Sequence, residues 1–262
     1  MYPEITLSIF HIQSYGLMVV IGAAAAVLWC LYAVKRSALD QQVLIDLLIA
    51  GGIGALVGAK LLYVLTTLPW IIANGFALFA SLEDILAYLS GGFVFYGGLI
   101  GLFAGVYIYA RRHHLEIDGY LAAGVPAIPL FHLFGRIGCF LSGCCYGEIS
   151  DSAFAMPMYT LANLDVLLPR IPVQLYEAAV NLMLFAVLAM LYRHAAPGRR
   201  MLGIYLSAYG VMRFALEFLR GDALRGIAIL STSQWIALVM VPLGIFMACK
   251  SNAARTQKKE RG

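Results

Sequence analysis

Six basic residues lie inside or beside apolar stretches of the chain, where a charge is costly. A charge near the middle of a bilayer costs at least about 2.5–3.5 kcal/mol, so it usually has a partner or a ligand. Arginine binds phosphate through a planar, bidentate fork, which suits a phospholipid headgroup. Structural ion pairs between helices are the alternative explanation. The basic residues are Lys60, Arg136, Arg170, Arg213, Arg220 and Arg225, and the carboxylates at similar positions are Glu177, Glu217 and Asp222.

The spacing of these residues favours positioned charges. Arg213 and Glu217 are four residues apart, so they lie on one face of a helix. Gly135 and Gly138 flank Arg136, which would allow the backbone to come close to a bound headgroup. The pattern favours a site that binds phosphate, since phospholipid phosphates lie at the same depth.

Transmembrane helices must position these groups. Of the 262 residues, 62% are hydrophobic and 12% are charged, roughly half the usual charged fraction, which excludes a soluble domain. Each spanning helix needs about 20 mostly apolar residues. A shorter segment, 119–135, contains Pro126 and Pro129 and is tolerated as a span where protein or water satisfies its freed backbone groups. We expect an all-α polytopic membrane protein with about seven transmembrane helices, the other six at 15–34, 44–66, 92–110, 173–192, 201–219 and 230–249.

Twelve of the 18 Lys and Arg residues follow the odd-numbered spans. The positive-inside rule therefore places the N-terminus outside and the C-terminus in the cytoplasm. The net charge of +4 is then a topology signal, and no nucleic-acid partner is expected. We expect one integral-membrane domain over residues 1–262, with 250–262 as a basic cytoplasmic tail. The clusters are Lys35 and Arg36; Arg111 and Arg112; Arg193, Arg199 and Arg200; and Lys250, Arg255, Lys258, Lys259 and Arg261.

The segment from His132 to Gly147 reads HLFGRIGCFLSGCCYG. It resembles the signature of the prolipoprotein diacylglyceryl transferases, whose usual form is close to GRIGNFINGE followed by two residues and Gly. Five further blocks resemble family motifs in the same order, so the resemblance covers almost the entire chain. They are SYGLM (Ser14–Met18), GAKLLYVL (Gly58–Leu65), YGGLIG (Tyr96–Gly101), RIPVQLYEA (Arg170–Ala178) and YGVMRFALEFLRGD (Tyr209–Asp222).

The resemblance implies a reaction in the bacterial plasma (inner) membrane. The family moves the sn-1,2-diacylglyceryl group of phosphatidylglycerol onto the lipobox cysteine thiol of a prolipoprotein, and glycerol phosphate leaves. Arg136 matches the family's signature arginine and Arg213 its sixth-helix arginine, so both are expected to clamp the phosphate. Glu217 is expected to orient Arg213, and Tyr96 lies at a position expected to be catalytic. Further substrate contacts are expected at Tyr15, Lys60, Cys139, Ser142, Cys144, Gln174, Glu177 and Arg220.

Four polar positions depart from the family pattern. Tyr96 replaces the usual His, Cys139 and Ser142 replace two Asn residues, and Cys144 replaces an acidic residue. Histidine is a natural general base for a thiol, whereas tyrosine, with a pKa near 10, is a poor one at neutral pH. Tyr96 can still orient a thiol or a headgroup by hydrogen bonding. A divergent relative that moves a lipid group to another acceptor therefore stays open as an alternative.

Three cysteines lie in the signature segment. Cys139, Cys144 and Cys145 could coordinate a metal, form a disulfide or supply a nucleophile. Their spacing matches no standard zinc pattern, so neither a metal nor a cofactor is expected. The lack of a C-x-x-C pair argues against the other alternative, a thiol-redox membrane protein. We expect reduced, packed thiols here, and Cys30 and Cys249 as small apolar packing residues.

Overall fold

The computed structural model describes residues 4–7, 10–74, 81–160, 163–221, 226–227 and 229–260. Two of the predicted site candidates, Asp222 and Arg225, lie outside these ranges. The chain divides into two compact units, one formed by Met1–Leu39 with Asp118–Gly262 and the other by Asp40–Ile117.

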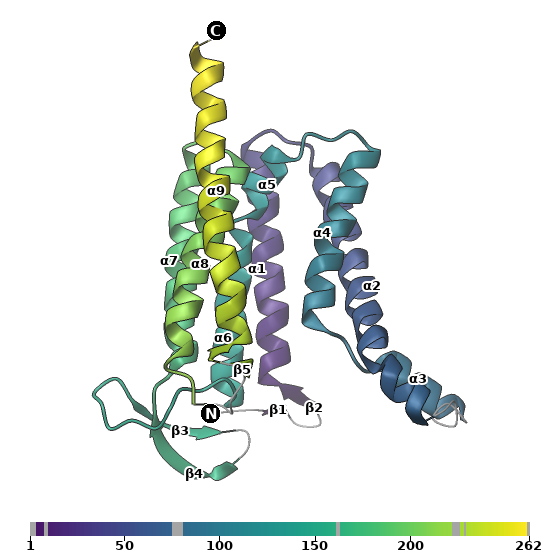
Figure 1. Ribbon diagram of the computed structural model, residues 1–262, viewed down its shortest axis with the longest axis vertical. Coiled ribbons are helices and arrows are strands. Elements are labelled where there is room, and N and C mark those ends of the chain that lie inside the picture. The colour runs from purple at the N-terminus through teal and green to yellow at the C-terminus, as the bar shows by residue number, and fades with distance from the viewer. Residues whose placement is uncertain are drawn as a thin grey trace. The chain divides into compact units, whose positions relative to one another are not determined.

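The first unit is a bundle of helices with short hairpins at one end (Figure 1). Each hairpin is a two-stranded antiparallel pair: β1 (Glu4–Leu7) with β2 (Phe10–Gln13), β3 (Met156–Thr160) with β4 (Asn163–Arg170), and β5 (Gly226–Ile227) with β6 (Leu230–Ser231). The helices are α1 (Ser14–Arg36), α5 (Asp118–Gly124), α6 (Ala127–Ser142), α7 (Val173–Arg193), α8 (Gly198–Glu217) and α9 (Thr232–Glu260).

The two ends of this bundle differ in sequence character. The hairpins lie where α1 begins, α6 ends, α7 begins, α8 ends and α9 begins (Figure 1). The opposite end carries basic residues, with Lys35 and Arg36 in the last turn of α1 and Arg193 in the last turn of α7. The basic clusters of this unit thus share one end, as their spacing along the sequence predicts.

Proline breaks the apolar segment at 118–142, as expected for the shortest predicted span. Pro126 separates α5 from α6, because its ring removes a backbone donor and clashes with the preceding turn. The α6 helix then ends at Gly143, whose φ of 71° is left-handed. This break and this turn fix the ends of the helix that carries Arg136.

The second unit contains α2 (Gln41–Asn74), α3 (Leu82–Ser90) and α4 (Phe95–Arg112). Glycines bring α2 and α4 into close contact, since a Cβ at Gly101 would collide with the carbonyl oxygen of Gly54, and one at Gly97 with that of Gly58. Small residues at four-residue spacing predict this close packing, and the structure confirms it.

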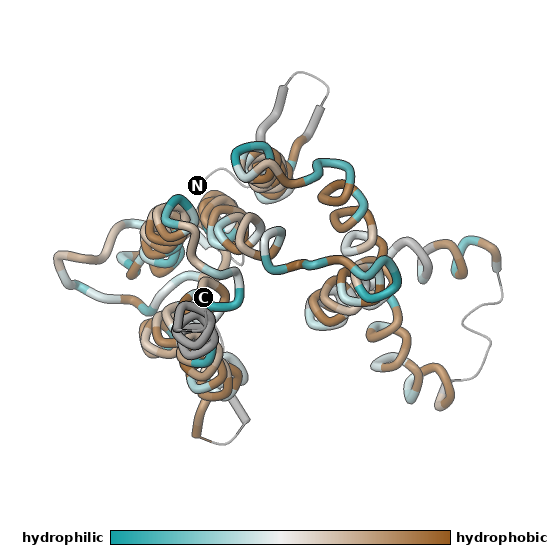
Figure 2. The backbone as a smooth tube through the Cα atoms, turned by 90° about the horizontal axis from the view of Figure 1, so that it is seen from above, coloured by the Kyte–Doolittle hydropathy of each residue, from teal (hydrophilic) through white to brown (hydrophobic). Residues whose placement is uncertain are grey.

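The exterior of the helices is apolar. Leu28, Val20 and Val239 each expose 66% of their surface, and Figure 2 shows hydrophobic colour along the helices and hydrophilic colour in the connecting turns. Among the described residues, five segments are long and apolar enough to cross a membrane: Ser14–Arg36, Gln41–Ala73, Asp118–Ser142, Val173–Arg193 and Thr232–Lys250. The fold is therefore that of a mostly helical, polytopic membrane protein.

Two further predicted spans correspond to helices that are less apolar. The α8 helix carries four charges (Arg199, Arg200, Arg213 and Glu217), and α4 has four glycines and ends on two arginines. The count of seven spans and the orientation of the termini stay predictions.

Candidate active site

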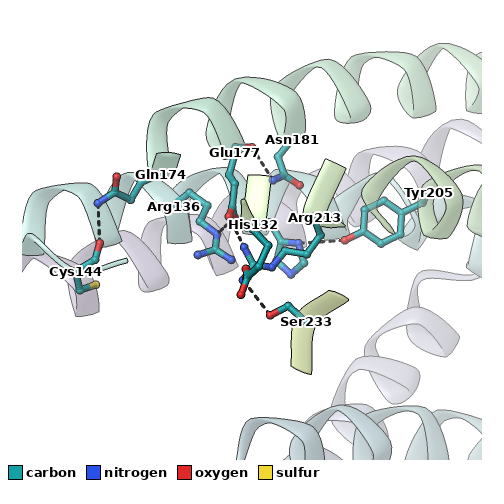
Figure 3. Close-up of polar contacts among 10 residues, drawn as sticks. His132, Arg136, Cys144, Gln174, Glu177, Asn181, Tyr205, Arg213 and Ser233 are labelled. Carbon is teal, nitrogen blue, oxygen red and sulfur yellow. Dashed lines mark hydrogen bonds and ion pairs between the residues drawn. The ribbon is translucent and has the colours of Figure 1, made fainter. Parts of the chain in front are cut away.

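A single buried carboxylate joins three helices at the hairpin end of the first unit. Glu177, in the second turn of α7, exposes 1% of its side chain and contacts two guanidinium groups. Its Oε2 forms an ion pair with Nε of Arg136, in α6, and its Oε1 lies 2.8 Å from Nη1 of Arg213, in α8 (Figure 3). The carboxylate thereby fixes both arginines relative to one another.

Arg213 has two more partners. Its Nη2 lies 2.6 Å from Oε2 of Glu217, one turn later in α8, and 3.1 Å from Oγ of Ser233, in the first turn of α9. Glu217 thus contacts Arg213, as their four-residue spacing indicates, and its role in orienting Arg213 for a reaction stays a prediction. Two arginines and two glutamates give this network a formal net charge of zero, which makes its partial burial tolerable.

Arg136 is held less completely than Arg213. It contacts Glu177 through Nε, and its side chain is 22% exposed, compared with 12% for Arg213. A contact through Nε does not engage the guanidinium fork end-on. His132, one turn earlier in α6, hydrogen-bonds through Nδ1 to the hydroxyl of Tyr205 at 3.1 Å, so it supports the helix packing beside the network.

The loop after α6 is tied to the ends of two other helices. Gln174, which is 1% exposed, donates from Nε2 to the carbonyl oxygen of Cys144 at 2.7 Å. The backbone nitrogen of Gly147 donates to Ile171 O at 2.9 Å, and that of Glu148 to Leu219 O at 3.0 Å. Only glycine fits at position 147, since a Cβ there would collide with the carbonyl oxygens of Ile171 and Leu219.

The three signature cysteines meet at the end of α6. Gly143 donates to Phe140 O at 3.2 Å and Cys144 to Cys139 O at 3.1 Å, which is the pattern of a Schellman turn. In this turn the residue after the glycine contacts the residue three positions before the helix end, and here both are cysteines. The Sγ atoms of Cys139, Cys144 and Cys145 lie within 4.8 Å of one another.

Charges and hydrogen bonds act on these thiols. Hydrogen bonds from Cys139 and then from Cys144 lower the pKa of the Cys145 thiol, and the positive charges of Arg220 and Arg136 lower it further. Tyr15, in the first turn of α1, packs against Gly138 and so lies beside the cysteine segment.

The structure brings most predicted site residues of the first unit to this one end. They come from the first turn of α1, the last two turns of α6, the first two turns of α7, the last two turns of α8, and the segments that directly follow α6 and α8. Ser142 is buried as the last residue of α6, and the backbone of Arg220 forms an isolated β-bridge with Gly147. The residues in question are Tyr15, Arg136, Cys139, Ser142, Cys144, Gln174, Glu177, Arg213, Glu217 and Arg220.

Two predicted residues belong to the second unit. Tyr96 lies in the first turn of α4 and is 46% exposed. Lys60, in α2, donates from Nζ to the carbonyl oxygens of Tyr88 at 2.5 Å and Gly91 at 2.8 Å. Its ammonium group therefore has backbone partners within its own unit.

Two residues that contact Glu177 or Arg213 were not predicted from the sequence. Asn181 is fully buried one turn after Glu177 and donates from Nδ2 to its carbonyl oxygen at 2.7 Å. Asn181 lies seven residues after Gln174 and four after Glu177, so all three share one face of α7. This spacing is a sequence signal that could have predicted its place beside them. Ser233 gave no such signal, because its contact depends on how α8 packs against α9.

Comparisons with known proteins place this site in a family context. The family model for prolipoprotein diacylglyceryl transferase matches residues 4–250. The chain is 34% identical over 236 residues to a phosphatidylglycerol–prolipoprotein diacylglyceryl transferase of Clostridium tetani, covering 90% of this chain and 92% of the relative. Relatives of the same name from Idiomarina loihiensis (34% over 265 residues; 95% and 94% covered) and Methylococcus capsulatus (35% over 257 residues; 92% and 92% covered) are also similar.

Proposed function

Since this chain belongs to the prolipoprotein diacylglyceryl transferase family, we infer that it transfers the sn-1,2-diacylglyceryl group of phosphatidylglycerol to a prolipoprotein. It is a membrane transferase of lipoprotein maturation. We propose further that the acceptor is the lipobox cysteine and that the membrane is the bacterial inner membrane.

The proposed reaction is a displacement at carbon. The acceptor sulfur attacks the glycerol carbon that carries the phosphate ester, a C–S bond forms, and the C–O bond breaks. The leaving oxygen keeps the electron pair, so negative charge grows on glycerol phosphate. Preorganised cationic donors stabilise such a developing charge well in a site that excludes water.

The observation that carries the proposal is the shared carboxylate of Glu177. It holds the guanidinium groups of Arg136 and Arg213 at one end of the bundle, and Arg136 meets it through Nε. The planar fork of Arg136 is suited to two oxygens of a phosphate. Because Arg136 meets Glu177 through Nε, a bound phosphodiester could contact the end of the guanidinium fork without displacing this carboxylate. We assign Arg136 as the phosphate clamp and Arg213 as a second cation that acts on the same leaving group.

The remaining contacts are proposed for the glycerol headgroup and the acceptor. The buried Oε1 of Gln174 has no hydrogen-bond partner among the described residues, which fits an acceptor for a headgroup hydroxyl. Tyr15, beside Gly138, is suited to the same region. Tyr96 is a poor base, so we assign it the orientation of the thiol or the headgroup. Substrate contacts by Lys60, Cys139, Ser142, Cys144 and Arg220 belong to the same proposal.

We propose that both compact units form one transferase domain over residues 1–262, which spans the membrane about seven times. The site end of the first unit would face outward and the basic end the cytoplasm. A reporter fused after Lys259 should therefore be cytoplasmic, and one inserted near Asp165 should be outside. Swapped locations would contradict the orientation.

The function is tested by incubating purified protein in detergent with phosphatidylglycerol labelled in its acyl chains and a lipobox peptide. The expected result is label on the peptide with an equal amount of free glycerol phosphate. A peptide with serine in place of the lipobox cysteine is the matched control and should stay unlabelled. Release of glycerol phosphate without label on the cysteine peptide would favour a second candidate function, transfer of the lipid group to another acceptor. The observation that favours this second candidate is Tyr96, which replaces the family's His.

A further inference from the structure

Three thiols lie close enough together to hold one metal ion. The Sγ atoms of Cys139, Cys144 and Cys145 are within 4.8 Å of one another. With metal–sulfur bonds of about 2.3 Å, thiolates on one tetrahedral ion are about 3.8 Å apart. Each pair of sulfur atoms would therefore have to approach by about 1 Å at most, a movement that side-chain rotation can supply.

Two local backbone turns bring the three cysteines together. Gly143 is left-handed with φ 71°, and the turn that it makes returns Cys144 to Cys139. Cys145 has φ 59°, a conformation that is uncommon for a residue other than glycine. This second left-handed residue keeps the Cys145 sulfur beside the other two rather than pointing along an extended strand.

Contacts around the cluster hold it in place. Gln174 binds the carbonyl oxygen of Cys144 at 2.7 Å, and the backbone hydrogen bonds of Gly147 and Glu148 anchor the following loop to Ile171 and Leu219. Outer contacts of this kind orient the ligands of protein metal sites. The positive charges of Arg136 and Arg220 act on the cluster, and they would offset the negative charge of three thiolates on a divalent ion.

The ligand set indicates the kind of metal. Soft thiolate ligands select Zn²⁺, Cu⁺ or iron–sulfur clusters over hard cations. Zinc with three protein ligands keeps its fourth position for water or substrate, as in catalytic zinc sites. Cys139 lies three residues after Arg136 in α6, so the ion and the proposed phosphate clamp would share one helix face.

We propose that Cys139, Cys144 and Cys145 bind one Zn²⁺ ion and that the acceptor thiol of the transfer reaction takes its fourth position. The second half of this proposal rests on the proposed function. As the acceptor binds, its S–H proton passes to solvent and a Zn–S bond forms. The bound thiolate attacks the glycerol carbon, the C–S bond forms, the C–O bond breaks with its electron pair on the leaving phosphate oxygen, and the product thioether leaves the ion.

Metal activation would give one cause for three of the four departures from the family pattern, those at positions 96, 139 and 144. A free thiol with a pKa near 8.5 is mostly protonated at neutral pH, and the tyrosine at position 96 is a poor base for it. A metal ion deprotonates the thiol that coordinates it, so zinc would perform the task of the family's histidine. The cysteines at positions 139 and 144, which replace an Asn and an acidic residue, would be the ligands that make this possible.

Metal binding is tested first, without any assay of activity. The intact protein in detergent is loaded with Zn²⁺, freed of unbound ion by gel filtration and assayed for zinc per chain. We expect one zinc in the wild type and in the control Cys30→Ser/Cys249→Ser, and none in Cys139→Ser/Cys144→Ser/Cys145→Ser. Single replacements keep the test informative if the triple variant fails to fold. Cys145→Ser should bind at least about 100-fold more weakly, since even the loss of an outer contact costs about 10- to 100-fold in metal affinity.

The role of the fourth position is tested with Co²⁺ as a spectroscopic probe. A lipobox peptide with its cysteine should change the sulfur-to-cobalt charge-transfer absorption, and the serine peptide should leave it unchanged. Transfer activity should fall with a chelator and return with Zn²⁺. Three results would each overturn the zinc site while the proposed function stands. They are no zinc uptake by a protein that still transfers, uptake of Cu⁺ alone, and a disulfide found by thiol titration. An unchanged cobalt spectrum overturns the acceptor role, and bound zinc with no transfer under any condition contradicts the proposed function and supports only the metal site.

Discussion

Arg136 and Lys60 are both cations in apolar helices, yet they meet different kinds of partner. Lys60 donates to two backbone carbonyl oxygens, those of Tyr88 and Gly91, and lies 4.9–5.5 Å from the centres of three aromatic rings. Arg136 shares the buried carboxylate of Glu177 with a second arginine and contacts it through Nε. A cation in an apolar helix therefore does not by itself indicate a substrate site, because backbone carbonyl oxygens can satisfy an ammonium group that closes a loop.

The two cations differ in how many hydrogen-bond donors remain for a ligand. An ammonium group has three donors and no fixed plane, and two of the donors of Lys60 are used by carbonyls. A guanidinium group has five donors in a rigid fork, and among the described residues Arg136 uses only Nε in its ion pair with Glu177. The arginine network is thus the region that a phosphate would recognise.

The largest effect is expected from Glu177→Gln, because both arginines depend on this carboxylate. Removing one partner of a buried ion pair costs about 3–5 kcal/mol of stability. Transfer should fall at least about 1000-fold, since each preorganised contact contributes about 100- to 1000-fold. Thermal unfolding in detergent and the transfer assay measure the two effects. Leu188→Ala, which opens a cavity at a fully buried residue of α7 outside the network, should cost a similar amount of stability, about 2–5 kcal/mol, and is the matched control that should retain most activity. Equal losses in both variants would contradict a positioning role for Glu177.

A smaller effect is expected from Arg213→Lys. Lysine cannot reach Glu177, Glu217 and Ser233 together in the planar arrangement that Arg213 has. Losing a hydrogen bond to a charged group costs about 1.5–3 kcal/mol, or about 10- to 100-fold in transfer rate. The control is Arg199→Lys, at the opposite end of α8, which should transfer at the wild-type rate. Unchanged kcat/KM in Arg213→Lys would show that this arginine only balances charge.

The smallest effect is expected from Lys60→Met. A hydrogen bond to a charged group contributes up to about 1.5–3 kcal/mol, but one of the two bonds of Lys60 is exposed to solvent, so a modestly lower unfolding temperature is expected. If Lys60 serves mainly to close the loop before α4, transfer should fall less than about 10-fold at saturating phosphatidylglycerol. A loss as large as that of Glu177→Gln would abolish the contrast between the two cations and place Lys60 with Arg136 among the groups that act on the leaving phosphate.

Local spacing predicted the parts of the site that lie on one helix. The contact of Arg213 with Glu217 follows from a four-residue interval, and the packing of α2 on α4 follows from glycines at the same interval. The bridge through Glu177 could not be predicted, because its partners lie 41 residues before and 36 residues after it in sequence, on other helices.

The close approach of the three cysteines also could not be predicted from the sequence. A C-x₄-C-C spacing matches no standard zinc pattern. The three thiols meet because two residues, Gly143 and Cys145, adopt the left-handed conformation on either side of Cys144. Glycine after a helix predicts the first turn, but nothing in the sequence predicts a left-handed cysteine.

The central claim is that Arg136 is a phosphate clamp, and Arg136→Lys tests it most directly. Lysine keeps the positive charge that Glu177 requires, so the variant should insert normally and elute as the wild type does in detergent. It loses the planar fork, so transfer from labelled phosphatidylglycerol to the lipobox peptide should fall about 100- to 1000-fold. Retention of most transfer activity in a normally inserted Arg136→Lys protein would contradict the assignment of the clamp and the placement of the active site.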